Sequence, residues 1–166
     1  CENCEAIKNS SHIDVLEMDA ASKTGVDDVR DLIEFSRYGP TSSKFKIFII
    51  DEVHMLSKQA FNALLKTLEE PPLYLKFIFA TTEIKKIPLT ILSRVHRFDL
   101  KRLEIELLTN HLFEILKREG LNAEKEALMT ISKEAAGSVR DALSILDQVL
   151  VNCETKIENQ MVNELL

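Results

Sequence analysis

Two short, nearly continuous apolar runs, Phe45–Ile50 and Leu75–Ala80, constrain the fold of this chain more than any other feature. Runs of this kind are typical of strands that are covered on both faces of a sheet. The segment between them has the apolar periodicity of a helix, with a serine able to cap its start and prolines after its end. We expect further elements of both kinds before and after: helices at Ser57–Glu70 and Val26–Ser36, and strands at Ile13–Met18 and Arg97–Leu100. This alternation predicts a parallel, doubly wound α/β sheet.

The pattern changes after Arg102, where amphipathic helices replace the alternation of strands and helices. Three helices are expected, broken at Gly120 and Gly137, and a fourth can start near Asn159. The three have the apolar spacing of helices and are Glu104–Glu119, Ala123–Ala136 and Ser138–Val151. The sequence therefore predicts two domains, an α/β core at residues 1–101 and a small helical domain at residues 102–166.

The composition is that of a soluble globular protein, with 45% apolar and 29% charged residues and a net charge of −6. That charge argues against a surface coated for nucleic acid. It is uneven, however: six basic residues and one acid lie between Ile84 and Arg102, so this segment carries +5 and the remainder −11. Basic loop clusters are commonly solvated surface. With three cysteines, no basic-then-apolar leader and no apolar run of about 18 residues, we expect a cytoplasmic protein.

Two adjacent carboxylates, Asp51 and Glu52, follow the first apolar run. Parallel sheets bind ligands at the carboxyl ends of their strands, so both acids are predicted to address one site. There, Asp51 can help to hold Mg²⁺ on a nucleotide, and Glu52 can orient and deprotonate the attacking water. The alternative is a strand that simply ends in solvated charges. The long apolar run before the pair and the capped helix after it favour the functional interpretation.

Polar residues in two later segments are candidates for contacts with phosphate. Thr81 and Thr82 follow the second apolar run, where a hydroxyl can contact the γ-phosphate or the attacking water, although a threonine can equally well just end a strand. Ser138 and Asp141 have the spacing of a helix cap, which is a structural role. Arg140, in the same first turn, is mildly unfavourable at the positive end of a helix, and a nearby anion would explain it.

Several of these motifs occur together, in order, in a known family. The acid pair, the strand ending in two threonines, the Ser93-Arg94 pair and the run Gly137–Leu143 resemble AAA+ ATPases. More narrowly, they resemble the gamma/tau family of bacterial DNA polymerase III clamp loaders. The resemblance covers nearly the whole chain and includes four long stretches: Asp19–Ser22, Ile50–Ser57, Phe61–Pro72 and Ile91–Arg94.

The resemblance implies a role for each candidate residue, with ATP and Mg²⁺ as ligands. Asp51 and Glu52 would be the Walker B pair, Thr82 (or Thr81) sensor 1 and Arg140 sensor 2. Arg94 would be an arginine finger that reaches the ATP of a neighbouring subunit, although it can also belong only to the solvated basic cluster. The implied fold is a parallel AAA+ sheet, incomplete in its N-terminal part, followed by a small helical lid.

The first residues include a C-x₂-C pair, Cys1 and Cys4. In the resembling family a four-cysteine Zn²⁺ module lies in this region, so the pair is expected to be half of a structural zinc site, and zinc needs four ligands. Cys153 is distant in the sequence. The four histidines lack ligand spacing and are interpreted as residues that bind no metal: His12, His54, His96 and His111.

The phosphate-binding loop G-x-x-x-x-G-K-[ST] is absent from these 166 residues. In the family this loop lies upstream of the zinc module, so we expect an internal fragment that is inactive alone and whose sheet lacks an inner strand. The parent protein is expected to be the motor that loads sliding clamps onto primed DNA, with other clamp-loader subunits, the clamp and the DNA polymerase III core as partners. Two alternatives remain: another AAA+ or helicase-type DNA-dependent ATPase, and a non-catalytic scaffold subunit of the same complex.

Overall fold

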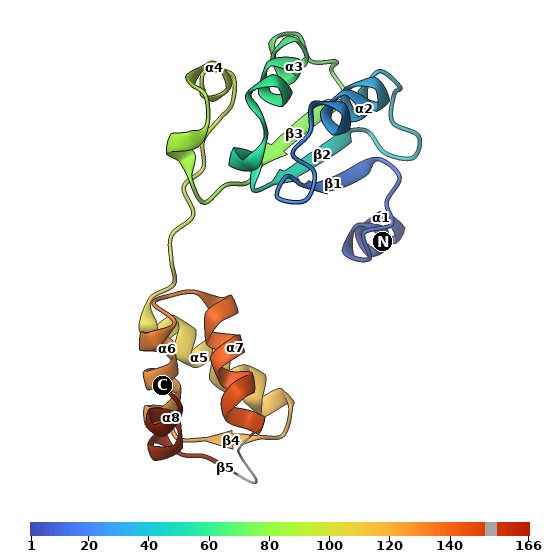
Figure 1. The fold of residues 1–166 in the computed structure, drawn as a ribbon. Coiled ribbons are helices and arrows are strands. Elements are labelled where there is room, and N and C mark those ends of the chain that lie inside the picture. Colours follow the sequence, from blue (N-terminus) through green and yellow to red (C-terminus); the bar gives the residue numbers. More distant parts are fainter. Residues whose placement is uncertain (152–155) are drawn as a thin grey trace. The chain divides into compact units, whose positions relative to one another are not determined.

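The computed structural model describes residues 1–151 and 156–166, which form two compact units, Cys1–Arg97 and Phe98–Leu166 (Figure 1). The predicted boundary after Lys101 falls in residues 96–104, which have no regular secondary structure. Cys153 lies outside the described residues. Among the described residues, none of the helices has both the length and the apolar character that crossing a bilayer requires.

The first unit contains a parallel three-stranded sheet in the order β1-β2-β3. The strands are β1 (Val15–Asp19), β2 (Lys46–Asp51) and β3 (Leu75–Phe79). Two longer helices, α2 (Val26–Ser36) and α3 (Lys58–Glu69), cover the same face of the sheet (Figure 1). The remaining elements are short: α1 (Glu2–Lys8), η1 (Val53–Met55), η2 (Ile84–Lys86) and α4 (Leu89–Leu92). The parallel α/β architecture expected from the sequence is confirmed.

The core of this unit lies between the sheet and its two helices. Phe48 and Ile50 of β2 pack there with Leu64 of α3 and Val29 of α2. The helix α3 begins as predicted, because the Ser57 hydroxyl accepts a hydrogen bond of 3.2 Å from the N–H of Ala60. Burial of these side chains from water is the main favourable term for this packing.

The opposite face of the sheet is less covered than the apolar runs suggested. Ile47 and Ile49 of β2 are only partly buried, and Ile78 of β3 is 50% exposed. The two-sided burial expected for these strands is therefore incomplete. Conversely, Lys46 is buried, with its Nζ donating to the Phe35 carbonyl at 3.1 Å, which satisfies a polar group inside the unit.

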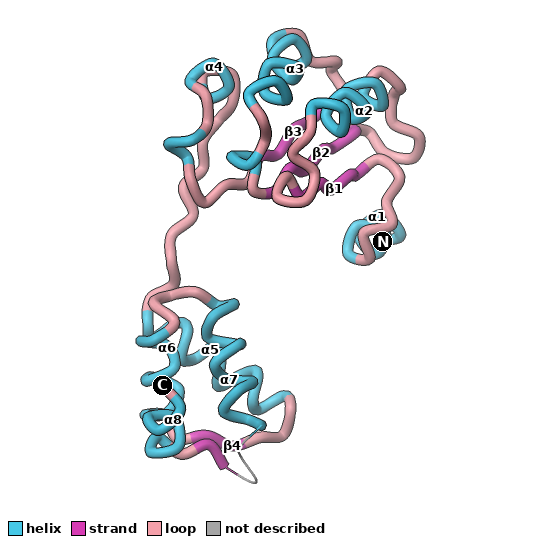
Figure 2. The backbone as a smooth tube through the Cα atoms, in the orientation of Figure 1, coloured by secondary structure: helices cyan, strands magenta, loops and turns pink. Residues whose placement is uncertain are grey.

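The prediction of a short strand at Arg97–Leu100 is wrong. Figure 2 shows the whole stretch from α4 to α5 as loop, and Phe98 and Leu100 are 84% and 95% exposed. A strand requires a neighbour to complete its hydrogen bonds, and no described strand pairs with this stretch. The alternation Phe-Asp-Leu is typical of a strand, but it does not show whether a pairing strand is present.

A buried acid ties two loops of the first unit together. Asp14 is fully buried, and its carboxylate accepts backbone hydrogen bonds of 2.7, 2.7 and 2.8 Å from Thr41, Ser42 and Ser43. Burial opposes ionisation, but these hydrogen bonds and that of the Ser42 hydroxyl outweigh it and lower the pKa of Asp14 to about 2. The loop at residues 41–43 is therefore anchored beside the start of β1.

We expect Asp14→Asn to lower the free energy of unfolding by about 1–3 kcal/mol, because the amide nitrogen that replaces one carboxylate oxygen cannot accept the backbone hydrogen bonds that this oxygen receives. The ionised carboxylate adds stability above its ordinary pKa near 3.8, and this stability is lost as the pH falls toward about 2. Urea unfolding at pH 7 measures the first effect, and the same experiment between pH 4 and 2 measures the second. Asp27→Asn, which changes an exposed surface ion pair, is the matched control. Equal unfolding curves for the two variants would contradict the anchoring role.

The second unit is a small helical bundle with a two-stranded parallel sheet, β4 paired with β5. Its elements are α5 (Ile105–Arg118), β4 (Asn122–Ala123), α6 (Lys125–Glu134), α7 (Val139–Val151), β5 (Lys156–Ile157) and α8 (Asn159–Leu165). The four predicted helices are all present, and the small sheet was not foreseen. The core residues are Leu108, Leu112, Leu128, Ile131, Leu146 and Val162.

Gly137 determines the turn between α6 and α7. Its φ is +82°, and a Cβ atom there would lie 2.5 Å from the carbonyl oxygen of Leu103. The Leu103 N–H donates to the Gly137 carbonyl at 3.1 Å, so the backbone approaches closely on both sides. Only glycine combines this φ with that contact without strain.

Candidate functional site

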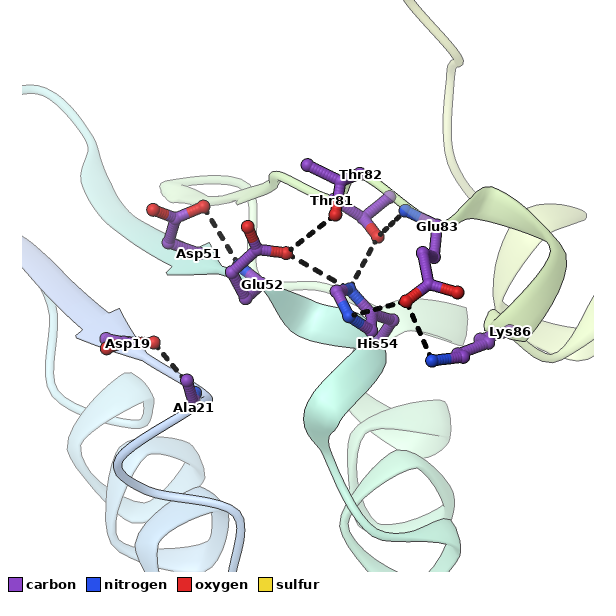
Figure 3. Close-up of polar contacts among 9 residues, drawn as sticks. All are labelled: Asp19, Ala21, Asp51, Glu52, His54, Thr81, Thr82, Glu83 and Lys86. Carbon is purple, nitrogen blue, oxygen red and sulfur yellow. Dashed lines mark hydrogen bonds and ion pairs between the residues drawn. The ribbon is translucent and has the colours of Figure 1, made fainter. Parts of the chain in front are cut away.

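The turn after β2 places the two acids next to each other. Asp51 ends β2, and its Oδ1 accepts a hydrogen bond of 2.9 Å from the N–H of Glu52. Glu52 has φ 46° and ψ 41°, a left-handed conformation that is uncommon for a residue with a side chain. Two backbone hydrogen bonds hold this turn against the end of β3: Val53 donates to Ala80 at 3.0 Å, and Ala80 donates to Ile50 at 2.9 Å. The Glu52 carboxylate consequently faces the end of β3 (Figure 3).

The two threonines that follow β3 have different partners. The Thr82 hydroxyl donates to Glu52 Oε2 at 3.2 Å. Thr81 Oγ1 accepts a hydrogen bond of 3.0 Å from the N–H of Glu83 and lies 3.0 Å from Nδ1 of His54. Of the two candidates that the sequence left open, Thr82 is the one whose hydroxyl contacts Glu52 (Figure 3).

A third carboxylate lies at the same edge and was missed in the sequence. Asp19 ends β1 and is the register partner of Asp51 in the parallel pair. The Ala20 N–H donates to the Asp51 carbonyl at 3.0 Å, and Asp19 Oδ1 accepts from the Ala21 N–H at 2.7 Å. The signal was available, because an acid directly follows the predicted strand and parallel strand ends share one edge.

The side chains at this edge suit Mg²⁺ that arrives with a nucleotide. Mg²⁺ is usually bound through one or two carboxylates together with substrate phosphates, and Asp51 is exposed at the strand end. Within residues 1–151 and 156–166, no group of three or more His, Cys, Asp or Glu side chains could hold a metal. An exposed carboxylate at a strand end fits a metal that is shared with phosphate oxygens.

His54 is a second residue of this site that sequence reasoning did not assign to it. Its side chain is 7% exposed, with Nδ1 3.2 Å from Glu52 Oε2 and Nε2 3.5 Å from Glu83 Oε1. Glu83 in turn accepts from Lys86 Nζ at 2.7 Å. That hydrogen bond is the main reason why the pKa of Glu83 lies below its usual value, while desolvation opposes the shift and the charges of Lys86 and His54 add to it. The one feature of the sequence that could have assigned His54 to the site is its position two residues after the acid pair.

Arg94 lies just after α4 and is held by residues of its own unit. Its Nη2 pairs with Glu69 Oε1 of α3 at 2.5 Å. Its Nη1 donates to the Thr90 carbonyl at 2.7 Å and contacts the Ser93 hydroxyl at 3.1 Å. The Glu69 pair is solvent-accessible on both sides, so its net contribution to stability is about 0–1 kcal/mol. The guanidinium can therefore leave Glu69 at little cost.

The remaining predicted residues belong to other elements of the chain. Arg140 belongs to the second unit, in the first turn of α7, where the Ser138 hydroxyl accepts from the Asp141 N–H at 3.3 Å as the capping pattern predicted. Cys1 and Cys4 are exposed free thiols whose sulfur atoms lie 3.3 Å apart. Their proximity fits one half of a tetrahedral zinc site, which takes four ligands.

Two family models match the chain in succession. The one described as "DNA polymerase III, delta subunit" matches residues 1–104, and the one described as "DNA polymerase III clamp loader subunit, ATPase lid domain" matches residues 107–155. The DNA polymerase III subunit tau/gamma of Haemophilus influenzae is 48% identical over all of this chain, which spans 24% of that relative's length.

Solved structures show the same fold. The Thermotoga maritima RuvB Holliday junction branch migration motor matches with a TM-score of 0.73 at 18% identity, over 96% of this chain and 53% of that one. A DNA polymerase III gamma subunit-related protein from the same organism matches with a TM-score of 0.54 at 25% identity, over 82% of this chain and 46% of that one.

A parallel sheet with an acid pair at its carboxyl edge, followed by a helical unit that matches an ATPase lid, defines an AAA+ ATPase fold. Within that class, the chain belongs to the gamma/tau family of DNA polymerase III clamp-loader subunits.

Proposed function

We propose that the protein containing this chain is the ATP-hydrolysing motor subunit of a DNA polymerase III clamp loader. ATP binding between subunits would order a ring that opens a sliding clamp on primed DNA, and hydrolysis would release the clamp onto the duplex. The observation that carries this proposal is the contact between Thr82 and Glu52 beside Asp51, at the carboxyl edge of the sheet, in a chain of this family.

The contacts of the first-unit residues support the roles proposed for them. Glu52 would accept a proton from the attacking water, which requires a carboxylate with a fixed orientation. Thr82 limits the rotation of that carboxylate by donating to Oε2. Asp51 would hold Mg²⁺, whose charge offsets the negative charge that develops on the phosphate oxygens.

Two arginines complete the proposed site from elsewhere. Arg94 would reach the γ-phosphate of ATP bound to a neighbouring subunit, where a guanidinium spreads positive charge over the phosphate oxygens. Arg140 would contact phosphate from the helical lid. Its place in the first turn of α7 supports this role, because an anion there offsets the unfavourable interaction of the cation with the helix dipole.

A structural zinc module is proposed for the N-terminal region of the full-length protein. Cys1 and Cys4 would supply two of the four thiolates. The proximity of their sulfur atoms, 3.3 Å apart across the first turn of α1, supports the assignment. Zinc there would be structural, because four protein ligands leave no open position for chemistry.

The proposed partners are the other clamp-loader subunits, the sliding clamp, the DNA polymerase III core and primed DNA, and the proposed location is the cytoplasm. Contacts with DNA would be made to the phosphate backbone, without sequence preference. A non-catalytic scaffold is the less favoured role, because the acid pair and its supporting threonine are all present in this chain. A branch-migration or helicase-type motor has only fold-level support, since the structural likeness to RuvB is at 18% identity.

The proposal is tested by clamp loading with the full-length protein and its partner subunits. We expect labelled clamps to be retained on primed circular DNA only when ATP is present, as measured by gel filtration. Binding of the complex to DNA should weaken as salt rises, with a linear dependence of log K on log salt concentration. DNA-stimulated ATP turnover without retained clamps would point to a different DNA-dependent motor. Loading that survives loss of Glu52 would point to a scaffold.

A further inference from the structure

His54 lies at the centre of the polar cluster that joins the ends of β2 and β3. The η1 turn (Val53–Met55) carries it back toward the strand ends, where its imidazole lies among side chains from the turn after β2 and the loop after β3 (Figure 3). Its side chain is almost fully buried, unlike the carboxylates beside it. Each of its ring nitrogens lies within 3.5 Å of a carboxylate oxygen. A side chain that only filled space in the core would not need these polar contacts, so His54 is a candidate for a role in the site.

The hydrogen-bonding rules of the partners limit how this cluster can work. An ionised carboxylate only accepts hydrogen bonds, so Glu52 Oε2 is engaged by His54 only when Nδ1 carries a proton. Thr81 Oγ1, 3.0 Å from the same nitrogen, can accept that proton or donate its own. Glu83 faces Nε2 and is itself held by Lys86, so it limits the rotation of the ring.

Glu52 Oε2 thus has two polar neighbours: Thr82 Oγ1, which donates a hydrogen bond to it at 3.2 Å, and His54 Nδ1, which lies at ion-pair distance, 3.2 Å away. A single hydrogen bond leaves a carboxylate free to rotate about its last side-chain bond, whereas a second polar contact on the same oxygen limits that rotation. A fixed plane matters for a base that must meet a water molecule in line with a phosphorus atom, since misplacement of about 1 Å can cost 10²-fold in rate.

We propose that His54 is a positioning residue for Glu52: its Nδ1–H orients the carboxylate that activates water, while Glu83 orients the imidazole from the other side. This inference rests on the proposed function of Glu52 as the base. His54 acts only through the Glu52 carboxylate. The inference therefore predicts an effect of His54 on the chemical step and none on nucleotide binding.

Three substitutions of His54 distinguish the effect of losing the Nδ1–H donor from the effect of losing the volume of the ring. His54→Ala removes both. His54→Asn retains an amide N–H near the position of Nδ1, and His54→Gln places its amide near that of Nε2. In the full-length protein assembled with its partner subunits, we expect His54→Ala and His54→Gln to lower kcat about 10-fold, with KM for ATP within about 2-fold of the original. His54→Asn should recover most of the turnover.

The controls distinguish this inference from the function on which it rests. His111→Ala, at an exposed position of the second unit, should leave turnover unchanged. Glu52→Gln is measured in parallel: if it keeps full turnover, the proposed function fails. Suppose instead that Glu52→Gln is inactive. Normal turnover by His54→Ala, or turnover by His54→Asn no faster than by His54→Gln, would then overturn only the positioning role of His54. Should the alanine variant fail to assemble, the Asn and Gln pair decides the question.

Discussion

Glu52→Gln in the full-length protein should bind ATP with nearly unchanged affinity and hydrolyse it at least about 10²-fold more slowly, the usual scale for loss of a general base. The amide cannot accept the proton of the attacking water. It can still accept the hydrogen bond from Thr82 through its carbonyl oxygen, so the turn after β2 has no reason to change. The prediction is a loss of the chemical step alone.

Steady-state turnover and equilibrium binding of a fluorescent ATP analogue, both measured on the assembled complex, check this result. Glu17→Gln is a matched control, because Glu17 is an exposed acid on β1 whose loss removes the same charge. Near-normal turnover in the Glu52 variant would mean that the acid pair only ends β2. A parallel loss of ATP binding would instead mean that the substitution disturbs the site as a whole.

Arg94→Ala should abolish ATP turnover and clamp loading in the complex while nucleotide affinity in the mutated subunit stays nearly unchanged. An arginine that reaches the neighbour's γ-phosphate contributes about 10³-fold or more to the rate. Its contacts with Glu69 and the Thr90 carbonyl, by contrast, predict only a small effect on stability, because the Glu69 pair is solvent-accessible. A large kinetic effect with a small stability effect is therefore the expected signature.

Lys85→Ala and Lys101→Ala are the controls, since both side chains are exposed cations of the same basic segment and each contributes about 0–1 kcal/mol. Complexes assembled from mutant and unmodified subunits locate the defect. If Arg94 acts across the interface, the mutant subunit disables the site of the neighbour that it faces. If the defect stays in the mutated subunit, or if all three alanine variants behave alike, Arg94 is a ligand within its own subunit or part of the solvated basic surface.

The sequence predicted regular elements well where apolar spacing decided them. The range Val26–Ser36 is α2 without change, and the run Phe45–Ile50 is β2 displaced by one residue. Ser57 caps α3 as its position indicated. In these segments burial and local hydrogen bonding favour the same conformation, so a pattern along the chain is sufficient. The strand predicted at Arg97–Leu100 failed because its formation depends on a neighbouring strand, which no local pattern can reveal.

The candidate site divides in the same way. The sequence by itself determined that Asp51 and Glu52 lie at the end of one apolar strand, that Thr81 and Thr82 follow another, and that the two strand ends meet, since parallel strands share a carboxyl edge. Only the tertiary structure decided which threonine contacts Glu52, that Arg94 rests on Glu69, and that His54 lies between two carboxylates. These contacts depend on the left-handed turn at Glu52 and on side chains brought together from different loops. Neither feature produces a regular spacing of residues, so neither can be recognised in the sequence.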